Sequence, residues 1–138
     1  MHNNRKRLTM TEELITLETA KLMKNKGFSE CVFTFYEADG VEGDMILSET
    51  YDYSENFNKR EGFLSAPSQS LVQKWLRETK NLHISIIRNA CGYGYDICKA
   101  DNGTHIADGI FKGPNDGGQW DTYEEALEVG IQEAIKLI

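Results

Sequence analysis

The sequence contains little of what marks a membrane protein, a secreted protein or a nucleotide-binding enzyme. None of its apolar runs approaches the roughly 18 residues of a membrane-spanning helix, and its polar, basic N-terminus lacks the apolar core of a signal peptide. No glycine-rich stretch ends in the Gly-Lys-Ser/Thr that cradles phosphate. We therefore expect a soluble cytoplasmic protein that does not enter membranes, and the length predicts one domain over residues 1–138.

Cysteine is scarce as well, and its pattern argues against disulfides and zinc. The three cysteines are an odd number, which favours reduced thiols over a closed disulfide framework. His83, Cys91, Cys98 and His105 follow one another at intervals of seven or eight residues, whereas zinc ligands usually come in close pairs such as Cys-x-x-Cys. We therefore interpret these residues as packed cysteines and strand histidines, and predict no metal site and no cofactor.

Positive charge is missing from one long segment. Between Gly27 and Asn58 there is no Lys or Arg, and eight acids give this segment a charge of −8, against a net charge of −7 for the whole chain. The acids are Glu30, Glu37, Asp39, Glu42, Asp44, Glu49, Asp52 and Glu55. This balance disfavours non-specific binding to nucleic-acid backbones.

The acidic segment has three interpretations. The simplest is a solvated excursion from the domain at about residues 38–63. A calcium loop is excluded because, counted from Asp39, the sixth position is Asp44 in place of the required glycine. The third interpretation is a recognition surface for a basic partner protein, since the acids are interleaved with aromatic side chains. The residues assigned to this candidate interaction surface are Tyr51, Asp52, Tyr53, Glu55 and Trp120.

Two segments in the first half of the chain carry the apolar periodicity and end signals of helices. The first has Thr11 as its expected N-cap and Gly27 as its left-handed C-terminal cap. The second begins at about Pro67, a residue suited to the first helical position, and ends at about Lys80. Trp75 lies in the apolar stripe of the second helix and is predicted to be core.

A third and clearest helix closes the chain. It begins at Thr122, which forms a capping box with Glu125. Its apolar stripe is Tyr123, Leu127, Gly130, Ile131, Ala134 and Ile138. Ile135 and Leu137 lie off this stripe, so the pattern also allows a homodimer through the helix or through a sheet edge. Trp120, just before the helix, either supports the helix start or is an exposed anchor for a partner.

The remaining segments predict strands and an α+β fold. Strands are expected at 31–36, 82–86, 92–99 and 105–111, with a short further strand at 45–47. Asp101-Asn102-Gly103 is the strongest hairpin signal in the chain. The order is then α-β-(β)-α-β-β-β-α. The predicted architecture is an antiparallel sheet of four to five strands with three helices packed over it.

The chemistry of the sequence leaves the function open. A cysteine nucleophile needs a nearby base, and no spacing in the chain supplies one, so no catalytic residue is assigned. A small ligand-binding domain or enzyme, with a site near Cys98 and His105, is the alternative to a binding protein. Residues 66–138 have the helix–three strands–helix order of double-stranded-RNA-binding domains. However, Asp121, Glu124 and Glu125 stand where such a domain needs basic residues, so nucleic-acid binding there is not expected.

Several phrases of the sequence resemble known proteins. SAPSQSLVQKWLRE at 65–78, the strand at 82–86 and TYEEALEVGIQEAIKLI at 122–138 are similar to small uncharacterised proteins of phages, prophages and mobile elements of gut bacteria. The likeness extends to residues 17–22 and 26–28 and implies no activity, cofactor or site. With the acidic, aromatic segment, it implies a non-enzymatic accessory protein that acts by binding another protein.

A second resemblance concerns the C-terminal third. Tyr95-Asp-Ile-Cys-Lys, the Gly103 turn and Asp121-Thr-Tyr-Glu-Glu-Ala-Leu are similar to the strand–strand–helix of HicB-type antitoxin domains. The sequence has Gly113-Pro-Asn-Asp-Gly-Gly118 in place of the proline-rich approach to the helix that those domains have, and we expect no DNA-binding segment after the helix. This likeness implies a further alternative, an antitoxin-like protein that neutralises a basic partner.

Overall fold

The computed structural model describes residues 11–40 and 43–138. The helices in these residues are α2 (Leu17–Asn25), α3 (Gln69–Thr79), α4 (Tyr123–Ile135) and the short 3-10 helix η1 (Phe57–Lys59). The strands are β1 (Thr34–Ala38), β2 (Met45–Glu49), β3 (Phe63–Ser65), β4 (Leu82–Asn89), β5 (Gly92–Lys99) and β6 (His105–Asp108). Among the described helices, none has the length and apolar character needed to cross a membrane.

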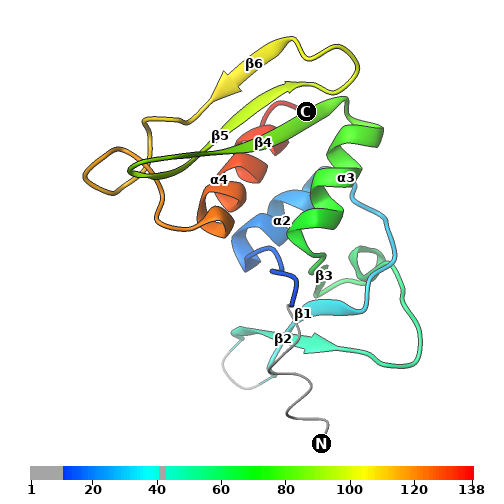
Figure 1. Ribbon diagram of the computed structural model, residues 1–138. Coiled ribbons are helices and arrows are strands. Elements are labelled where there is room, and N and C mark those ends of the chain that lie inside the picture. The colour runs from blue at the N-terminus through cyan, green and yellow to red at the C-terminus, as the bar shows by residue number, and fades with distance from the viewer. Residues whose placement is uncertain (1–10, 41–42) are drawn as a thin grey trace, which may run out of the picture.

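The strands form two antiparallel sheets, and the helices lie between them (Figure 1). The order is β2-β1-β3 in one sheet, called the first sheet below, and β4-β5-β6 in the other, called the second sheet. Helix α4 packs on β4 and β5, α3 packs on β4 and α4, and α2 packs on α4 and β3. The predicted α+β class is confirmed. The strands do not form the predicted single sheet of four to five strands, and β3 was not predicted.

Helix α3 separates the strands of the first sheet from those of the second along the chain. β1 pairs with β2 along one edge and with β3 along the other, so no further strand can join it. After β3 the chain turns toward α2, where the Pro67 carbonyl accepts a hydrogen bond of 3.0 Å from the backbone N–H of Ile15. Helix α3 follows, and β4 pairs with β5 and not with a strand of the first sheet.

Backbone pairing between residues 13–15 and 67–69 makes the first two helices begin later than predicted. Residues 13–15 run extended beside residues 67–69, because Leu14 and Ser68 form a β-bridge and the Gln69 N–H donates to the Glu13 carbonyl at 2.8 Å. Helix α2 therefore begins after Thr16, and the prediction of Thr11 as its N-cap is wrong. In α3 the N-cap is Ser68, so Pro67 precedes the helix and is not its first residue.

Several local predictions are confirmed. Gly27 has φ +83°, and the Phe28 N–H donates to the Met23 carbonyl at 3.1 Å, which closes α2 in the expected left-handed cap. Thr122 and Glu125 form the capping box of α4. The hairpin turn between β5 and β6 has Gly103 at φ +76°.

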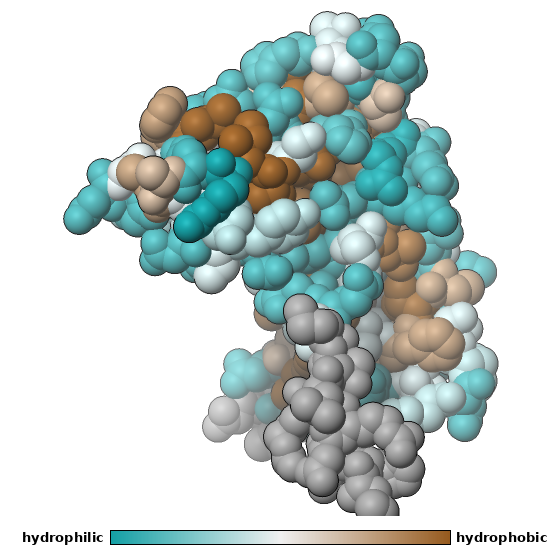
Figure 2. Space-filling view, in the orientation of Figure 1, coloured by the Kyte–Doolittle hydropathy of each residue, from teal (hydrophilic) through white to brown (hydrophobic). Residues whose placement is uncertain are grey.

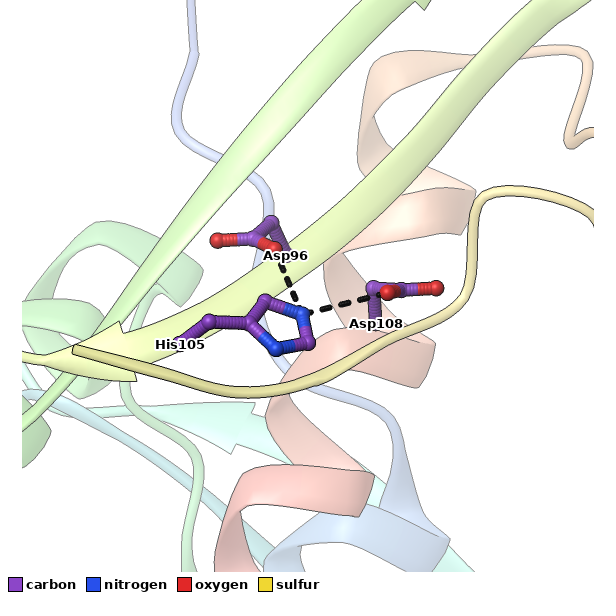
Figure 3. A group of neighbouring side chains, drawn as sticks. All are labelled: Asp96, His105 and Asp108. Carbon is purple, nitrogen blue, oxygen red and sulfur yellow. Dashed lines mark hydrogen bonds and ion pairs between the residues drawn. The ribbon is translucent and has the colours of Figure 1, made fainter.

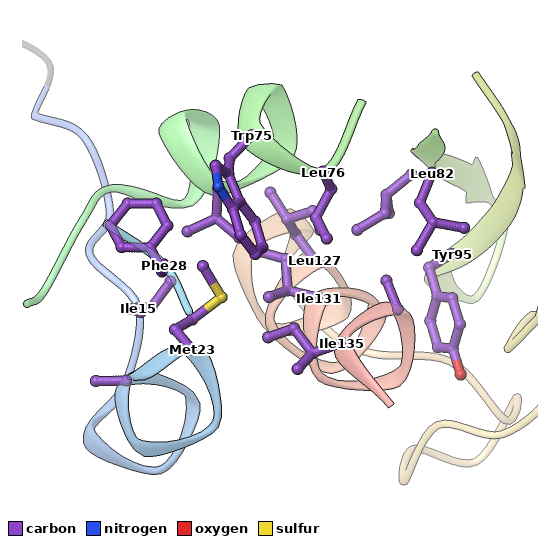
Figure 4. Packing of buried hydrophobic residues seen from close by; sticks show 14 of the residues in the cluster. Ile15, Met23, Phe28, Trp75, Leu76, Leu82, Tyr95, Leu127, Ile131 and Ile135 are labelled. Atoms are coloured by element: carbon purple, nitrogen blue, oxygen red, sulfur yellow. The ribbon is translucent and has the colours of Figure 1, made fainter. Parts of the chain in front are cut away.

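The core lies where α4 meets the other two helices and the second sheet (Figure 4). Trp75 is 7% exposed and contacts Phe28 edge to face, with the ring centroids 5.4 Å apart. The buried stripe of α4 is Ala126, Leu127, Gly130, Ile131, Ala134 and Ile135. Tyr123, which was predicted to belong to the stripe, is 42% exposed, and Ile135, which was not, is fully buried. The stripe thus begins one turn later than predicted, because residues 123–125 form the exposed first turn.

Candidate functional site

Strand β2 is an open edge of the first sheet. Within the described part of the chain it pairs only with β1. The Asp39 N–H donates to the Asp44 carbonyl and the Thr50 N–H to the Phe33 carbonyl, each at 2.8 Å. These two bonds at the ends of the ladder determine which backbone groups of β2 bond to β1. By antiparallel alternation, the N–H and C=O groups of Leu47 point away from β1. This edge therefore offers backbone donors and acceptors to an added strand.

Exposed apolar side chains accompany that edge. Ile46 is 45% exposed and Leu47 is 51% exposed, and as neighbours in a strand they lie on opposite faces of the sheet. Phe33, which leads into β1, is 52% exposed, and hydrophobic surface is visible over this segment at the lower right of Figure 2. No residue of β2 is buried. The edge thus leaves apolar surface in water that a partner would cover.

Four of the five predicted interaction residues lie together on the segment that follows β2. Tyr51 and Tyr53 are 83% and 63% exposed, and Asp52 is exposed as well. The Tyr51 hydroxyl donates to the Glu49 carboxylate at 2.7 Å, and this hydrogen bond raises the pKa of Tyr51. Glu55 is half-buried: its backbone pairs with that of Val32, and its carboxylate lies 3.7 Å from the Arg60 guanidinium.

The fifth predicted residue, Trp120, does not join this surface. It is 8% exposed, forms a β-bridge with Tyr93 beside the second sheet, and its ring centroid lies 5.8 Å from that of Tyr95. The interpretation of Trp120 as an exposed anchor is therefore wrong. Its ring belongs to the core, because residues 113–120 fold back against β5, where the Tyr93 N–H donates to the Trp120 carbonyl at 2.8 Å.

A cleft with a volume of about 540 Å³ lies at the N-terminal ends of the three helices. Glu128 of α4 holds these ends together. One of its carboxylate oxygens accepts hydrogen bonds from the Thr16 N–H at 2.9 Å and from the Thr16 and Thr19 hydroxyls. The other accepts from the Gln69 side chain at 2.9 Å. Since Glu128 satisfies donors at the start of α2, we assign the cleft a structural role.

The acids at the start of α4 remain exposed. Glu124 and Glu125 stand in the first turn, and Asp121 precedes the helix. The order α3-β4-β5-β6-α4 is the one predicted for residues 66–138. The negative charge at this helix start is unsuited to contacts with RNA phosphates.

The outer face of the second sheet gathers polar side chains. Tyr95 and Ile97 of β5 are buried on the side of α4, so Asp96 and Cys98 lie on the opposite face. Across the three strands, His83 pairs with Cys98, and Cys98 with His105. In the neighbouring row, Ser85 pairs with Asp96, and Asp96 with Asp108. The polar face is therefore His83, Ser85, Asp96, Cys98, His105 and Asp108.

His105 lies between the two aspartates of this face (Figure 3). Its Nε2 atom is 3.2 Å from Asp96 Oδ1 and 3.1 Å from Asp108 Oδ2. The side chains of His105, Asp108 and Asp96 are 57%, 41% and 26% exposed, so solvent reaches all three. Their ligand atoms lie within 4.8 Å of one another, and these are residue types that bind metal ions.

The predicted alternative site near Cys98 and His105 includes one member of this group, His105, and omits Asp96 and Asp108. The long spacing of His83, Cys91, Cys98 and His105 predicts no metal site. The turn at Gly103 was the available signal, because a hairpin there places residues 98 and 105 opposite each other. Cys91 is exposed near the turn between β4 and β5 and is not part of the polar face.

Comparisons with protein-family models, with curated proteins and with solved structures found no significant match for this chain.

Proposed function

We propose that this protein acts by binding another protein, and that the binding surface is the open edge of β2 together with residues 50–55. The observation that supports this proposal best is strand β2, which pairs on one side only among the described residues and exposes Ile46 and Leu47 on its two faces. Sheets bind extended peptides by adding a strand at such an edge, where main-chain hydrogen bonds supply affinity and alternate side chains supply specificity.

The partner that fits this edge is an extended, basic segment of a protein. The eight acids between residues 27 and 58, with no Lys or Arg among them, favour a partner of opposite charge. Tyr51 and Tyr53 supply large side chains of the kind that anchor interfaces. Binding would cover the exposed apolar side chains of β2 and pair its free N–H and C=O groups.

The biological setting we propose follows from the resemblance to small proteins of phages, prophages and mobile elements. In that setting the protein is a non-enzymatic accessory factor of the cytoplasm. Neutralisation of a basic toxin, in the manner of an antitoxin, is one special case of the same binding surface. A toxic neighbouring gene that encodes a basic protein would support this case.

The decisive variant is Leu47→Pro. Proline removes the one N–H of Leu47 that points to the open edge, whereas the ladder to β1 uses the N–H groups of Ile46 and Ser48. Immobilised wild-type protein and Leu47→Pro would be incubated with nuclease-treated lysate of host cells, and a captured protein then purified and titrated directly. We expect Leu47→Pro to weaken its binding at least tenfold, and Leu47→Ala, the side-chain control, to weaken it less.

The double variant Tyr51→Ala/Tyr53→Ala tests the second half of the surface. Both rings are mostly exposed, so we expect lost capture with an unchanged melting temperature. Capture that survives both this variant and Leu47→Pro would contradict the proposal. Self-association lost in Leu47→Pro, measured by analytical ultracentrifugation, would replace the foreign partner with a second copy of the chain.

A further inference from the structure

The polar face of the second sheet supports a function that is separate from the β2 edge. We propose that Asp96, His105 and Asp108 bind one divalent transition-metal ion of the zinc type, with the remaining coordination positions open to water or to a small anionic ligand. The three residues come from two adjacent strands, β5 and β6, and their ligand atoms already converge.

The distances fit metal coordination. Zinc lies about 2.0–2.2 Å from imidazole nitrogen and carboxylate oxygen, so two ligand atoms of a tetrahedral site are roughly 3.3 Å apart. His105 Nε2 is 3.2 Å from Asp96 Oδ1 and 3.1 Å from Asp108 Oδ2. All three ligand atoms lie within 4.8 Å of one another, so an ion needs at most a small rearrangement of side chains that are themselves partly exposed.

The hydrogen bonds of the group also leave room for a cation. A neutral imidazole carries at most one proton on Nε2 and can donate it to only one acceptor at a time, yet two carboxylates approach that atom. Within the described residues, no Lys or Arg forms an ion pair with Asp96 or Asp108. A metal ion in place of the proton would contact both carboxylates at once and balance their charge.

The donor set selects the class of ion. Imidazole nitrogen suits zinc and its neighbours in the first transition row, whereas magnesium and calcium prefer sites made of oxygen atoms alone. Cys98 lies opposite both His83 and His105 on the same face, so a rival site built on sulfur is the alternative that the experiment must separate. The proposed site has three protein ligands, and catalytic zinc sites likewise keep a position free for water.

The test is isothermal titration calorimetry of the full chain, with any purification tag removed, against zinc chloride. We expect one ion per chain and no heat with magnesium chloride. Asp96→Asn, Asp108→Asn and His105→Gln should each weaken zinc binding by more than about tenfold, since even residues that only support a ligand can cost 10–100-fold. Asp101→Asn is the matched control, because it removes one carboxylate from the turn of the same hairpin, and it should bind like the wild type.

Circular dichroism of each variant verifies that the fold is intact, and cobalt absorption spectra report the ligand types independently of affinity. The spectrum of the wild type should lack the intense band of a cobalt–sulfur bond, and Cys98→Ser should bind zinc normally. The proposal is overturned if the folded wild type binds no zinc, or if the three ligand variants bind it as well as Asp101→Asn does. It is equally overturned if Cys98→Ser or His83→Gln, and not Asp96→Asn, abolishes binding.

Discussion

The two sheets have the same number of strands but differ in how much of each is covered. In the second sheet, α3 and α4 cover one face, and Leu82, Ile84, Tyr95 and Ile97 are all less than 8% exposed. In the first sheet, Phe35 is the one apolar strand residue in the described part of the chain that is buried, and β2 has no buried residue. The second sheet thus belongs to the structural core, whereas the edge strand β2 of the first sheet is exposed along its length in the described part of the chain.

The largest contrast is expected in the free energy of unfolding when the same isoleucine side chain is truncated beside the second sheet and in the first sheet. Ile131 of α4 is fully buried between the helices and the second sheet, whereas Ile46 of β2 is 45% exposed. We expect Ile131→Ala to lower the free energy of unfolding by about 2–5 kcal/mol, and Ile46→Ala by less than about 1 kcal/mol. Urea unfolding followed by circular dichroism measures both values. Equal losses would show that β2 is as much a part of the core as α4.

A smaller loss is expected from the contact that ties α2 to α4. Glu128→Ala removes the acceptor of the Thr16 N–H and of the Gln69 amide, and leaves these donors without their partner. The expected cost is about 1–3 kcal/mol, from the same urea measurement. Glu133→Ala is the control on the same helix. It breaks only the exposed pair with Lys136 and should cost about 0.5 kcal/mol or less.

The capping box of α4 should contribute less to the free energy of unfolding than the hydrogen bonds that Glu128 accepts. The Thr122 hydroxyl accepts from the Glu125 N–H at 3.1 Å, and the Glu125 carboxylate accepts from the Thr122 N–H at 3.1 Å. Thr122→Ala should lower the free energy of unfolding by about 1 kcal/mol, and Thr122→Ser by much less, because serine retains the acceptor. Equal losses in the two variants would mean that the threonine methyl group, and not the cap, stabilises the helix.

Features that depend on neighbouring residues could be predicted from the sequence, whereas features that depend on pairing between distant segments could not. The capping box at Thr122, the left-handed cap at Gly27 and the hairpin turn at Gly103 depend on residues within one turn of each other, and all three are present. The N-cap at Thr16 depends on residues 13–15 pairing with residues 67–69, far along the chain. No local signal separates Thr16 from Thr11, so that prediction failed.

The candidate sites follow the same rule. Tyr51 and Tyr53 are close in sequence and were found by composition, whereas the group around His105 needs a register between strands. The irregularity between Ile97 and Cys98 shifts that register, so that Asp96 faces Asp108 while Cys98 faces His105. The intervals between residues along the sequence do not reveal this shift in strand register, so they could not predict that the two aspartates lie beside His105.

The smallest expected effect is a loss of stability at high pH that depends on one tyrosine from each sheet, Tyr36 and Tyr95. Burial raises the pKa of Tyr36, with a further contribution from the negative charge of Glu128. Burial also raises the pKa of Tyr95, with contributions from Glu133 and then Asp108. A raised pKa means that folding favours the neutral phenol. Its stabilising contribution is complete below the unfolded pKa of about 10 and is lost as the pH rises through the folded pKa.

The free energy of unfolding should therefore fall between about pH 9 and pH 11, and Tyr36→Phe and Tyr95→Phe should each reduce that fall. Urea midpoints at the two pH values measure the change, with Tyr53→Phe, at a mostly exposed tyrosine, as the control. Tyr36→Phe should also be less stable at neutral pH, because it loses the 2.8 Å hydrogen bond that its hydroxyl donates to the Ile15 carbonyl. If only Tyr95→Phe reduces the loss of stability at alkaline pH, this pH dependence arises in the second sheet alone. Tyr36 would then ionise as readily in the folded as in the unfolded protein, despite its hydrogen bond to the Ile15 carbonyl.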